Sequence, residues 1–236
     1  DKNHFRIISS AATRERDKFH INKHLSKNIE LKDITDDLCV FGLFGPKSRV
    51  LLKNLSDDNF ENDQFKFGCA KFITIDGVKI WTQRLSYVGE LGYELYTDLK
   101  DAKKIYELLI EKGKDFNLSN CGMHAMDIMR MESGFLHWGH DISPEENQYQ
   151  AGLAFTISNK KDVDFIGKQA LEKIKQDKVK TRFSMFTLKE SEPGKPLLLH
   201  DEPIYIDDKI IGRSTSGNYS FNFKKNLVFG YINNDL

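Results

Sequence analysis

The feature that most constrains the fold is a loss of helical periodicity after about residue 175. Upstream, apolar residues follow both strand-like alternation and helical spacing, whereas downstream only short strands separated by turn residues are indicated. The predicted downstream strands are 182–188, 203–206, 209–212 and 227–232. The sequence therefore predicts an α+β region over residues 1–175, followed by a small all-β domain, a barrel or sandwich, over residues 176–236.

Several strands are predicted in the first region. Residues 5–8 form an apolar segment of strand type, and residues 38–44 are a continuous apolar run, as expected for a strand covered on both faces. Asp76-Gly77 is a type I′ turn signal between two alternating segments, which predicts a hairpin. A further strand is expected at 93–96.

Helical spacing predicts five helices in the same region. They are a mostly solvated helix over 10–26, a helix beginning near Pro46, a helix over 101–112 with Gly113 as its C′ residue, a helix over 122–133 closed by Gly134, and a short helix over 164–174.

Composition excludes some classes of partner. Lys plus Arg and Asp plus Glu both number 35, so the chain has no net field with which to hold nucleic acid or an anionic membrane. No apolar run approaches the length of a membrane span. The three cysteines are far apart, which favours reduced thiols and a cytoplasmic protein.

Features at both ends of the sequence predict that the chain is part of a longer protein. The chain begins at Asp1 rather than Met, a predicted strand follows almost at once, and another predicted strand lies four residues from the end. We therefore expect truncation at both ends, with an incomplete C-terminal domain.

The loop before the 93–96 strand is the first candidate site. Gly89 and Gly92 bracket Glu90, and glycines permit a positive φ and close approach of the backbone to a ligand. A carboxylate held there matches a ligand with two adjacent N–H donors, such as the 2-amino-pyrimidinone edge of a pterin. A solvated turn is the alternative.

The predicted helix over 122–133 carries the second candidate. Arg130 shares a face with methionines, which indicates either a ligand pocket or a buried ion pair. Asp127, one turn earlier, is the candidate partner for such a pair, and a purely structural bridge is the alternative to ligand binding through the planar guanidinium.

Two further segments carry polar groups. His137, His140 and Asp141 lack the spacing of a helical zinc site, so a hydrogen-bonded loop at a pocket rim is expected, with Trp138 packed in the core. No metal site is predicted. Residues 212–217 match neither a phosphate-binding loop nor a nucleophile elbow and are expected to form a tight polar turn.

Five segments together carry a family resemblance. They are Leu43-Phe44-Gly45-Pro46, Tyr87 to Glu94, Ala125 to Gly134, Phe165 to Leu171, and Gly212 to Gly217. In this order they resemble the LxGP, YxGExGxE, AxDxxRxExG, FIGxxAL and GxxTSG motifs of the aminomethyltransferase (glycine cleavage T-protein) family. The variants VGELGYELY and HWGHDI are similar to the folate-binding domain of dimethylglycine and sarcosine dehydrogenases.

The resemblance implies a tetrahydrofolate-binding domain followed by a small β-barrel, and it covers nearly the whole chain. It implies that Glu90 holds the pterin ring, that Arg130 lines the same cavity, and that Tyr87 neighbours the ring. The family's catalytic aspartate lies in a segment before residues 5–8, which this chain does not include. No residue of this chain is therefore assigned as the catalytic acid–base.

The implied activity is tetrahydrofolate-dependent transfer of an aminomethyl or methylene unit from a methylated-amine substrate. Flavin would be bound only by a separate oxidase domain, because these residues contain no dinucleotide fingerprint. The alternatives are a folate-binding accessory module without transferase activity, and a related folate-dependent demethylase.

Overall fold

The computed structural model describes residues 3–158 and 163–235. Contacts between residues divide the chain into two compact units. Unit 1 comprises residues 1–86 and 90–119, and unit 2 comprises residues 87–89 and 120–236. The predicted domain boundary near residue 175 stays a prediction.

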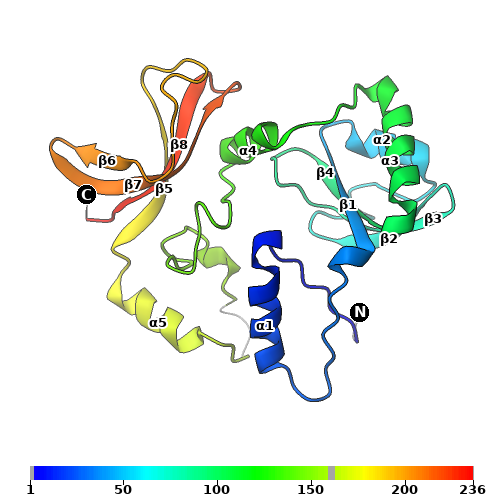
Figure 1. Ribbon diagram of the computed structural model, residues 1–236, viewed down its shortest axis with the longest axis horizontal. Helices are drawn as coiled ribbons and strands as arrows, with labels where there is room; N and C mark the ends of the chain where they lie inside the picture. The colour runs from blue at the N-terminus through cyan, green and yellow to red at the C-terminus, as the bar shows by residue number, and fades with distance from the viewer. Residues whose placement is uncertain (1–2, 159–162, 236) are drawn as a thin grey trace. The chain divides into compact units, whose positions relative to one another are not determined.

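Unit 1 is an antiparallel sheet covered by two helices (Figure 1). Its strands, in spatial order, are β1 (Leu38–Phe44), β4 (Gly92–Asp98), β3 (Val78–Gln83) and β2 (Ala70–Ile75). The helices α2 (Ser48–Leu55) and α3 (Leu99–Gly113) pack against each other and against β4, so both cover the same face. Their buried leucines and isoleucines join the inward side chains of the strands in one core.

The hairpin between β2 and β3 confirms the predicted turn. Asp76 has φ +47° and Gly77 has φ +77°, as a type I′ turn requires at both central positions. The flanking strands pair in register, from Ala70 opposite Gln83 to Ile75 opposite Val78.

The helix α1 (Arg14–His24) confirms the predicted solvated helix, since none of its residues is buried. It follows a 3₁₀ turn at Ala11–Thr13. Arg14 anchors it to the following segment through ion pairs with Asp33 and Asp36, each at 2.8 Å. Further 3₁₀ turns lie at Thr35–Asp37, Lys114–Phe116 and Ala154–Thr156.

Three expectations for the first region are wrong. Residues 5–8 form no strand, because they pair with no other strand among the described residues and Phe5 is 87% exposed. The strand β1 is not covered on both faces, since Val40 is 48% exposed. Gly113 is helical, and the left-handed residue after α3 is Asn117, with φ +60°.

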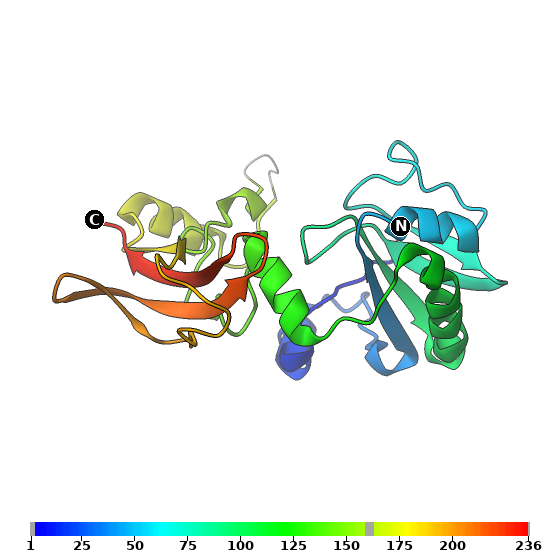
Figure 2. The ribbon, with the colours of Figure 1, turned by 90° about the horizontal axis from the view of Figure 1, so that it is seen from above.

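Unit 2 combines two helices with a second antiparallel sheet. Its strands, in spatial order, are β5 (Thr181–Thr187), β8 (Lys225–Asn233), β7 (Lys209–Ser220) and β6 (Pro203–Ile206). The helix α4 (Met123–Glu132), bright green in Figure 2, packs against β7 and β8, and α5 (Lys168–Asp177) precedes β5. Met131 of α4 joins Phe183, Leu227 and Phe229 of the sheet in the unit's core.

The structure confirms the α+β fold class, and β5–β8 are the only regular elements that begin after residue 177 in the described residues. Residues 212–217 are not a tight turn, because they lie inside β7 and pair with β8. Their hydroxyl groups are buried rather than solvated, with Ser214 and Thr215 each 2% exposed. Among the described residues, no helix has the length and apolar character needed to span a bilayer.

Candidate functional site

Arg130 is the centre of a buried polar network in unit 2. Its side chain is 1% exposed, although it lies on the helix α4. Nε donates to Asp127 Oδ1 at 2.8 Å, and Nη2 donates to Ser216 Oγ at 2.9 Å. Nη2 also lies 2.8 Å from Asp127 Oδ1 in an ion pair. Nη1 donates to the Phe135 carbonyl and to Asp141 Oδ2. These four hydrogen bonds use four of the five N–H groups of a guanidinium.

Asp141 is the buried counterpart of Arg130. It is 0% exposed, and its Oδ1 accepts hydrogen bonds from Thr215 Oγ1 at 2.6 Å and Ser216 Oγ at 2.8 Å. Oδ2 accepts from Arg130 and from the His137 backbone N–H. A buried carboxylate satisfied in this way holds three segments together, because its donors come from α4, from β7 and from the loop at His137.

Local sequence explains how these elements converge. Gly134, with φ +73°, ends α4, and the Phe135 N–H then bonds back to the Arg130 carbonyl, so the chain reverses beside the helix end. On β7, a register shift between Ser214 and Ser216 leaves an extra residue in the strand. Such a bulge turns side chains from their regular alternation, and here Thr215 and Ser216 both reach Asp141.

Beside this network lies a cavity of about 290 Å³. It is lined by Tyr87, Met123, His124, Met126, Asp127, Arg130, His137, His140, Leu198, Leu199, His200, Thr215, Ser216 and Gly217. All of these residues belong to unit 2. The cavity therefore brings together two of the sequence-predicted site residues, Tyr87 and Arg130.

Tyr87 forms one wall of this cavity. Its hydroxyl donates to the Leu136 carbonyl at 2.8 Å, and its ring is nearly parallel to that of Phe135, at 6.2 Å between centroids. Burial raises the pKa of the Tyr87 hydroxyl, so it remains a neutral donor at physiological pH. The ring is thereby fixed as a flat surface.

The histidine loop lies at the same cavity, as expected. His137 and His140 are in contact, with ring centroids 4.6 Å apart. Burial lowers the pKa of His137, with the neighbouring His140 contributing in the same direction. Trp138 is not packed in the core, because it is 37% exposed. No group of metal-ligating side chains occurs in residues 3–158 and 163–235.

Glu90 belongs to unit 1, and its side chain is exposed. The preceding residue, Gly89, has φ +74°, as the sequence predicted for this loop. A Cβ at Gly89 would lie 2.0 Å from Ser133 Oγ, at the end of α4, so any other residue there would have to displace the Ser133 side chain. That Glu90 and Arg130 face one cavity stays a prediction.

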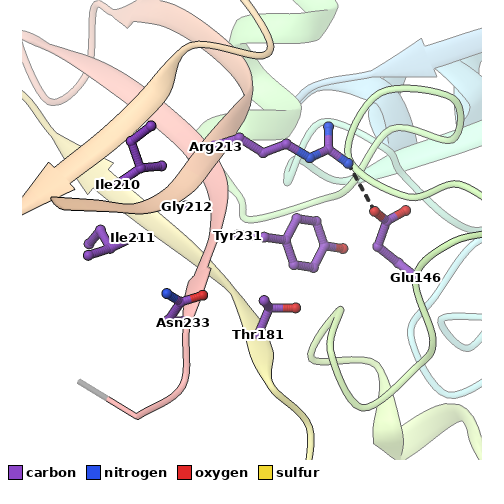
Figure 3. A pocket seen from close by; sticks show the side chains of 8 residues that line it. All are labelled: Glu146, Thr181, Ile210, Ile211, Gly212, Arg213, Tyr231 and Asn233. Atoms are coloured by element: carbon purple, nitrogen blue, oxygen red, sulfur yellow. Dashed lines mark hydrogen bonds and ion pairs between the residues drawn. The ribbon is translucent and has the colours of Figure 1, made fainter.

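A second cavity, of about 400 Å³, lies on the β7–β8 side of unit 2. Figure 3 shows Arg213 of β7 reaching Glu146, with which it forms an ion pair at 3.1 Å. Arg213 also pairs with Asp201 at 2.7 Å, so both terminal nitrogens are engaged. The Tyr231 hydroxyl donates to the Asp141 carbonyl at 2.8 Å. None of the predicted site residues lines this cavity, and we assign the candidate site to the first one.

Sequence reasoning missed the roles of Asp141, Thr215 and Ser216. Asp141 was visible as a carboxylate in the histidine loop, but its partners are distant in sequence. The hydroxyl run on β7 resembled a turn because it lacks apolar residues. Its direct continuation of a predicted strand was the one signal that the strand extends further.

Two family models match the chain. The GCVT N-terminal domain matches residues 1–161, and the glycine cleavage T-protein C-terminal barrel domain matches residues 182–236. The chain therefore belongs to the aminomethyltransferase (glycine cleavage T-protein) family, as the motifs indicated.

The chain is also similar to individual members of this family. The chain is 35% identical to human mitochondrial dimethylglycine dehydrogenase over 205 residues, which cover 87% of this chain and 23% of that protein. It is 35% identical to 4-methylaminobutanoate oxidase (formaldehyde-forming) of Paenarthrobacter nicotinovorans over 91% of this chain and 26% of that protein. An aminomethyltransferase of Anoxybacillus flavithermus is 29% identical over 97% of this chain and 62% of that protein. The chain thus spans about a quarter of the length of the dehydrogenase and the oxidase.

A solved structure shares the fold. The aminomethyltransferase of the glycine cleavage system from Bartonella henselae aligns with a TM-score of 0.76 over 94% of this chain and 59% of that chain, at 20% identity.

Proposed function

We propose that this chain is the tetrahydrofolate-binding, one-carbon-transfer region of a protein similar to dimethylglycine and sarcosine dehydrogenases. The observation that carries the proposal is that two of the family's motifs meet at one cavity, through Tyr87 and Arg130. Similarity to dimethylglycine dehydrogenase over 87% of the chain supports the choice of branch. Any flavin chemistry would belong to another region of such a protein.

The cavity suits the ring end of a folate rather than the whole molecule. At about 290 Å³ it lies at the lower limit for drug-sized ligands. The Tyr87 ring offers a flat wall, and the half-buried Met126 offers a soft, adaptable one. When bound, the folate would supply the nitrogens that accept the one-carbon unit, and the protein would supply orientation and electrostatics.

The predicted residues take different parts in this proposal. Glu90, on its exposed loop, accepts two hydrogen bonds from the pterin edge. Tyr87 supports the ring. Arg130 lines the cavity, but four of its N–H groups donate to protein acceptors, so we assign it the positioning of the surrounding loop.

The test is calorimetric titration of tetrahydrofolate into the wild-type chain and the Glu90→Gln variant. Glutamine keeps the size of the side chain but places an NH₂ donor where one acceptor oxygen stood. Loss of a charge-assisted hydrogen bond costs about 1.5–3 kcal/mol, so we expect affinity to fall roughly ten- to hundredfold.

Glu94→Gln is the matched control. Glu94 lies on β4, where it accepts a hydrogen bond from the Tyr96 hydroxyl at 2.6 Å. We expect this variant to bind tetrahydrofolate as the wild type does. Equal affinity of the wild type and Glu90→Gln would contradict the role of Glu90, whereas similar losses at both positions would indicate general damage to the loop.

A further inference from the structure

Two histidines lie on one face of the exposed helix α1. His20 and His24 are four positions apart at the end of the helix, and their ring centroids are 4.7 Å apart with 45° between the ring planes. Residues at this spacing in a helix are neighbours on adjacent turns of the same face. Both side chains are exposed, so solutes reach the rings. The helical backbone therefore holds two imidazoles side by side in water.

A hydrogen bond of His24 determines which of its ring nitrogens is available. Nδ1 lies 2.8 Å from the His20 carbonyl oxygen, which can only accept, so Nδ1 carries the proton and donates. In the neutral ring the lone pair is then on Nε2. Metal-ligating histidines commonly donate their other ring N–H to a backbone carbonyl, which fixes the tautomer and the ring orientation. His24 is therefore held in the way that a metal ligand is held.

The separation of the two rings suits one shared metal ion. Zinc lies about 2.0–2.1 Å from an imidazole nitrogen, so two imidazoles on one tetrahedral ion have centroids roughly 5 Å apart. The observed 4.7 Å is close to this value, so rotation of the side chains is enough to bring both rings to one ion. Two histidines at i and i+4 on one helix face are also the pair with which zinc-binding helices hold their ion.

The charges around the pair permit a cation. His20 and His24 lie at the C-terminal end of α1, where the helix dipole places partial negative charge. Arg16, one turn before His20, is paired with Asp17 at 2.9 Å, which offsets its charge. Lys23 lies in the same turn, but its long flexible stem allows the ammonium group to stay in water, away from the ion.

A bound ion would stabilise a helix that receives little support from packing. No residue of α1 is buried, and a short helix in water is marginal without an apolar face packed on a core. Ion pairs from Arg14 and Lys18 to Asp33 hold the first half of the helix. An ion shared by His20 and His24 would hold the last turn, because a ligand that binds only the folded form stabilises that form.

We propose that His20 and His24 form a surface site for a divalent transition-metal ion of the class of Cu²⁺, Ni²⁺ and Zn²⁺, which bridges the last turn of α1. Imidazole suits these ions, whereas Mg²⁺ and Ca²⁺ prefer oxygen ligands. Water completes the coordination, since no group of three or more ligating side chains occurs among the described residues. The pair belongs to unit 1, whereas the residues of the candidate cavity belong to unit 2, and the inference does not depend on the proposed function.

The test is a titration of the whole chain, without an affinity tag, with NiCl₂ at pH 7.5, followed by amide NMR. Imidazole is mostly neutral at this pH, as a metal requires. Ni²⁺ is paramagnetic and broadens the resonances of nearby nuclei. We expect it to broaden the amide resonances around His20 and His24, whereas MgCl₂ at the same concentrations should leave them unchanged.

The matched control keeps the composition and moves one histidine off the face. Asn22→His combined with His24→Asn leaves two histidines in α1, but residues i and i+2 do not face each other on a helix. We expect the affinity of α1 for Ni²⁺ to fall at least roughly tenfold, because the second imidazole can no longer bind the same ion intramolecularly. Both exchanged positions are exposed, so the core is unaffected. Ni²⁺ bound elsewhere, such as at the exposed thiols of Cys69 and Cys121, is the same in both proteins.

A second variant, His20→Asn, removes one ligand and keeps His24, and it should lose the same affinity. Equal broadening around α1 in the wild type and the exchanged variant, or in the wild type and His20→Asn, would overturn the inference, as would an equal response to MgCl₂.

Hydrogen exchange tests whether the ion stabilises the helix. ZnCl₂ at ten times its Kd should slow exchange of the last-turn amides of α1 roughly tenfold in the wild type and not in the exchanged variant. Exchange that is unchanged by zinc in the wild type would refute the bridging of the last turn.

Discussion

At the scale of single residues, two separate features favour glycine at position 89. Its φ of +74° disfavours any side chain, and a Cβ would collide with Ser133 Oγ. Ser133 Oγ is itself held by a hydrogen bond to the Met129 carbonyl at 3.0 Å. The glycine before Glu90 is therefore required by its contact with α4 as well as by the turn.

Gly89→Ala should destabilise the protein more than backbone strain alone explains. Strain in the left-handed region costs about 1–2 kcal/mol, and displacing Ser133 adds about 1 kcal/mol for its lost hydrogen bond. Gly152→Ala is the control, because Gly152 has φ +72° in the same unit with nothing within 4 Å of the added Cβ. Urea unfolding should show the larger loss for Gly89→Ala, and equal losses would mean that Ser133 moves without cost.

At the scale of elements, β7 is the strand that joins the polar network to the sheet. It pairs with β6 on one side and β8 on the other, and its bulge delivers Thr215 and Ser216 to the same oxygen of Asp141. The burial of the Thr215 and Ser216 hydroxyls is tolerated here because both have the charged Asp141 as partner.

Thr215→Val tests whether that partnership stabilises the strand. Valine keeps the shape and suits a strand, but it removes a donor from a buried carboxylate, which costs about 1.5–3 kcal/mol. Thr187→Val on β5 is the matched control, because Thr187 is exposed and should tolerate the change. The measurement is thermal unfolding followed by circular dichroism. If both variants melted at the same temperature as the wild type, the hydrogen bond from Thr215 to Asp141 would not stabilise the strand.

At the scale of the whole molecule, stability should depend on pH through His137. Burial lowers its pKa in the folded state, so between that value and the ordinary pKa of about 6.5 the unfolded chain binds more protons. The stabilisation is therefore fully present above about pH 6.5 and is lost as pH falls through the folded-state pKa.

His137→Asn should reduce the decline of the melting temperature between pH 7 and pH 5. His20→Asn is the control, because His20 is exposed on α1. The same decline in the wild type and His137→Asn would show that other groups cause the pH dependence.

The sequence by itself determined the features that depend on neighbouring residues. Asp76-Gly77 specified the turn of its hairpin, Gly134 specified the end of α4, and apolar spacing located α3. It also identified the family, because five ordered motifs are a property of the chain and need no coordinates. Turn chemistry and side-chain period act over a few residues, so local sequence is enough to predict them.

Tertiary structure alone decided where the polar groups are satisfied. Arg130 bonds to Ser216, 86 positions away, and the Asp141 carboxylate collects donors from β7 and α4. The sequence predicted a tight polar turn over residues 212–217 and core packing of Trp138, and both predictions are wrong. A hydroxyl can be buried only where the fold places a hydrogen-bond partner beside it. Removing a polar group from water costs free energy, and a donor or acceptor distant in sequence must offset that cost.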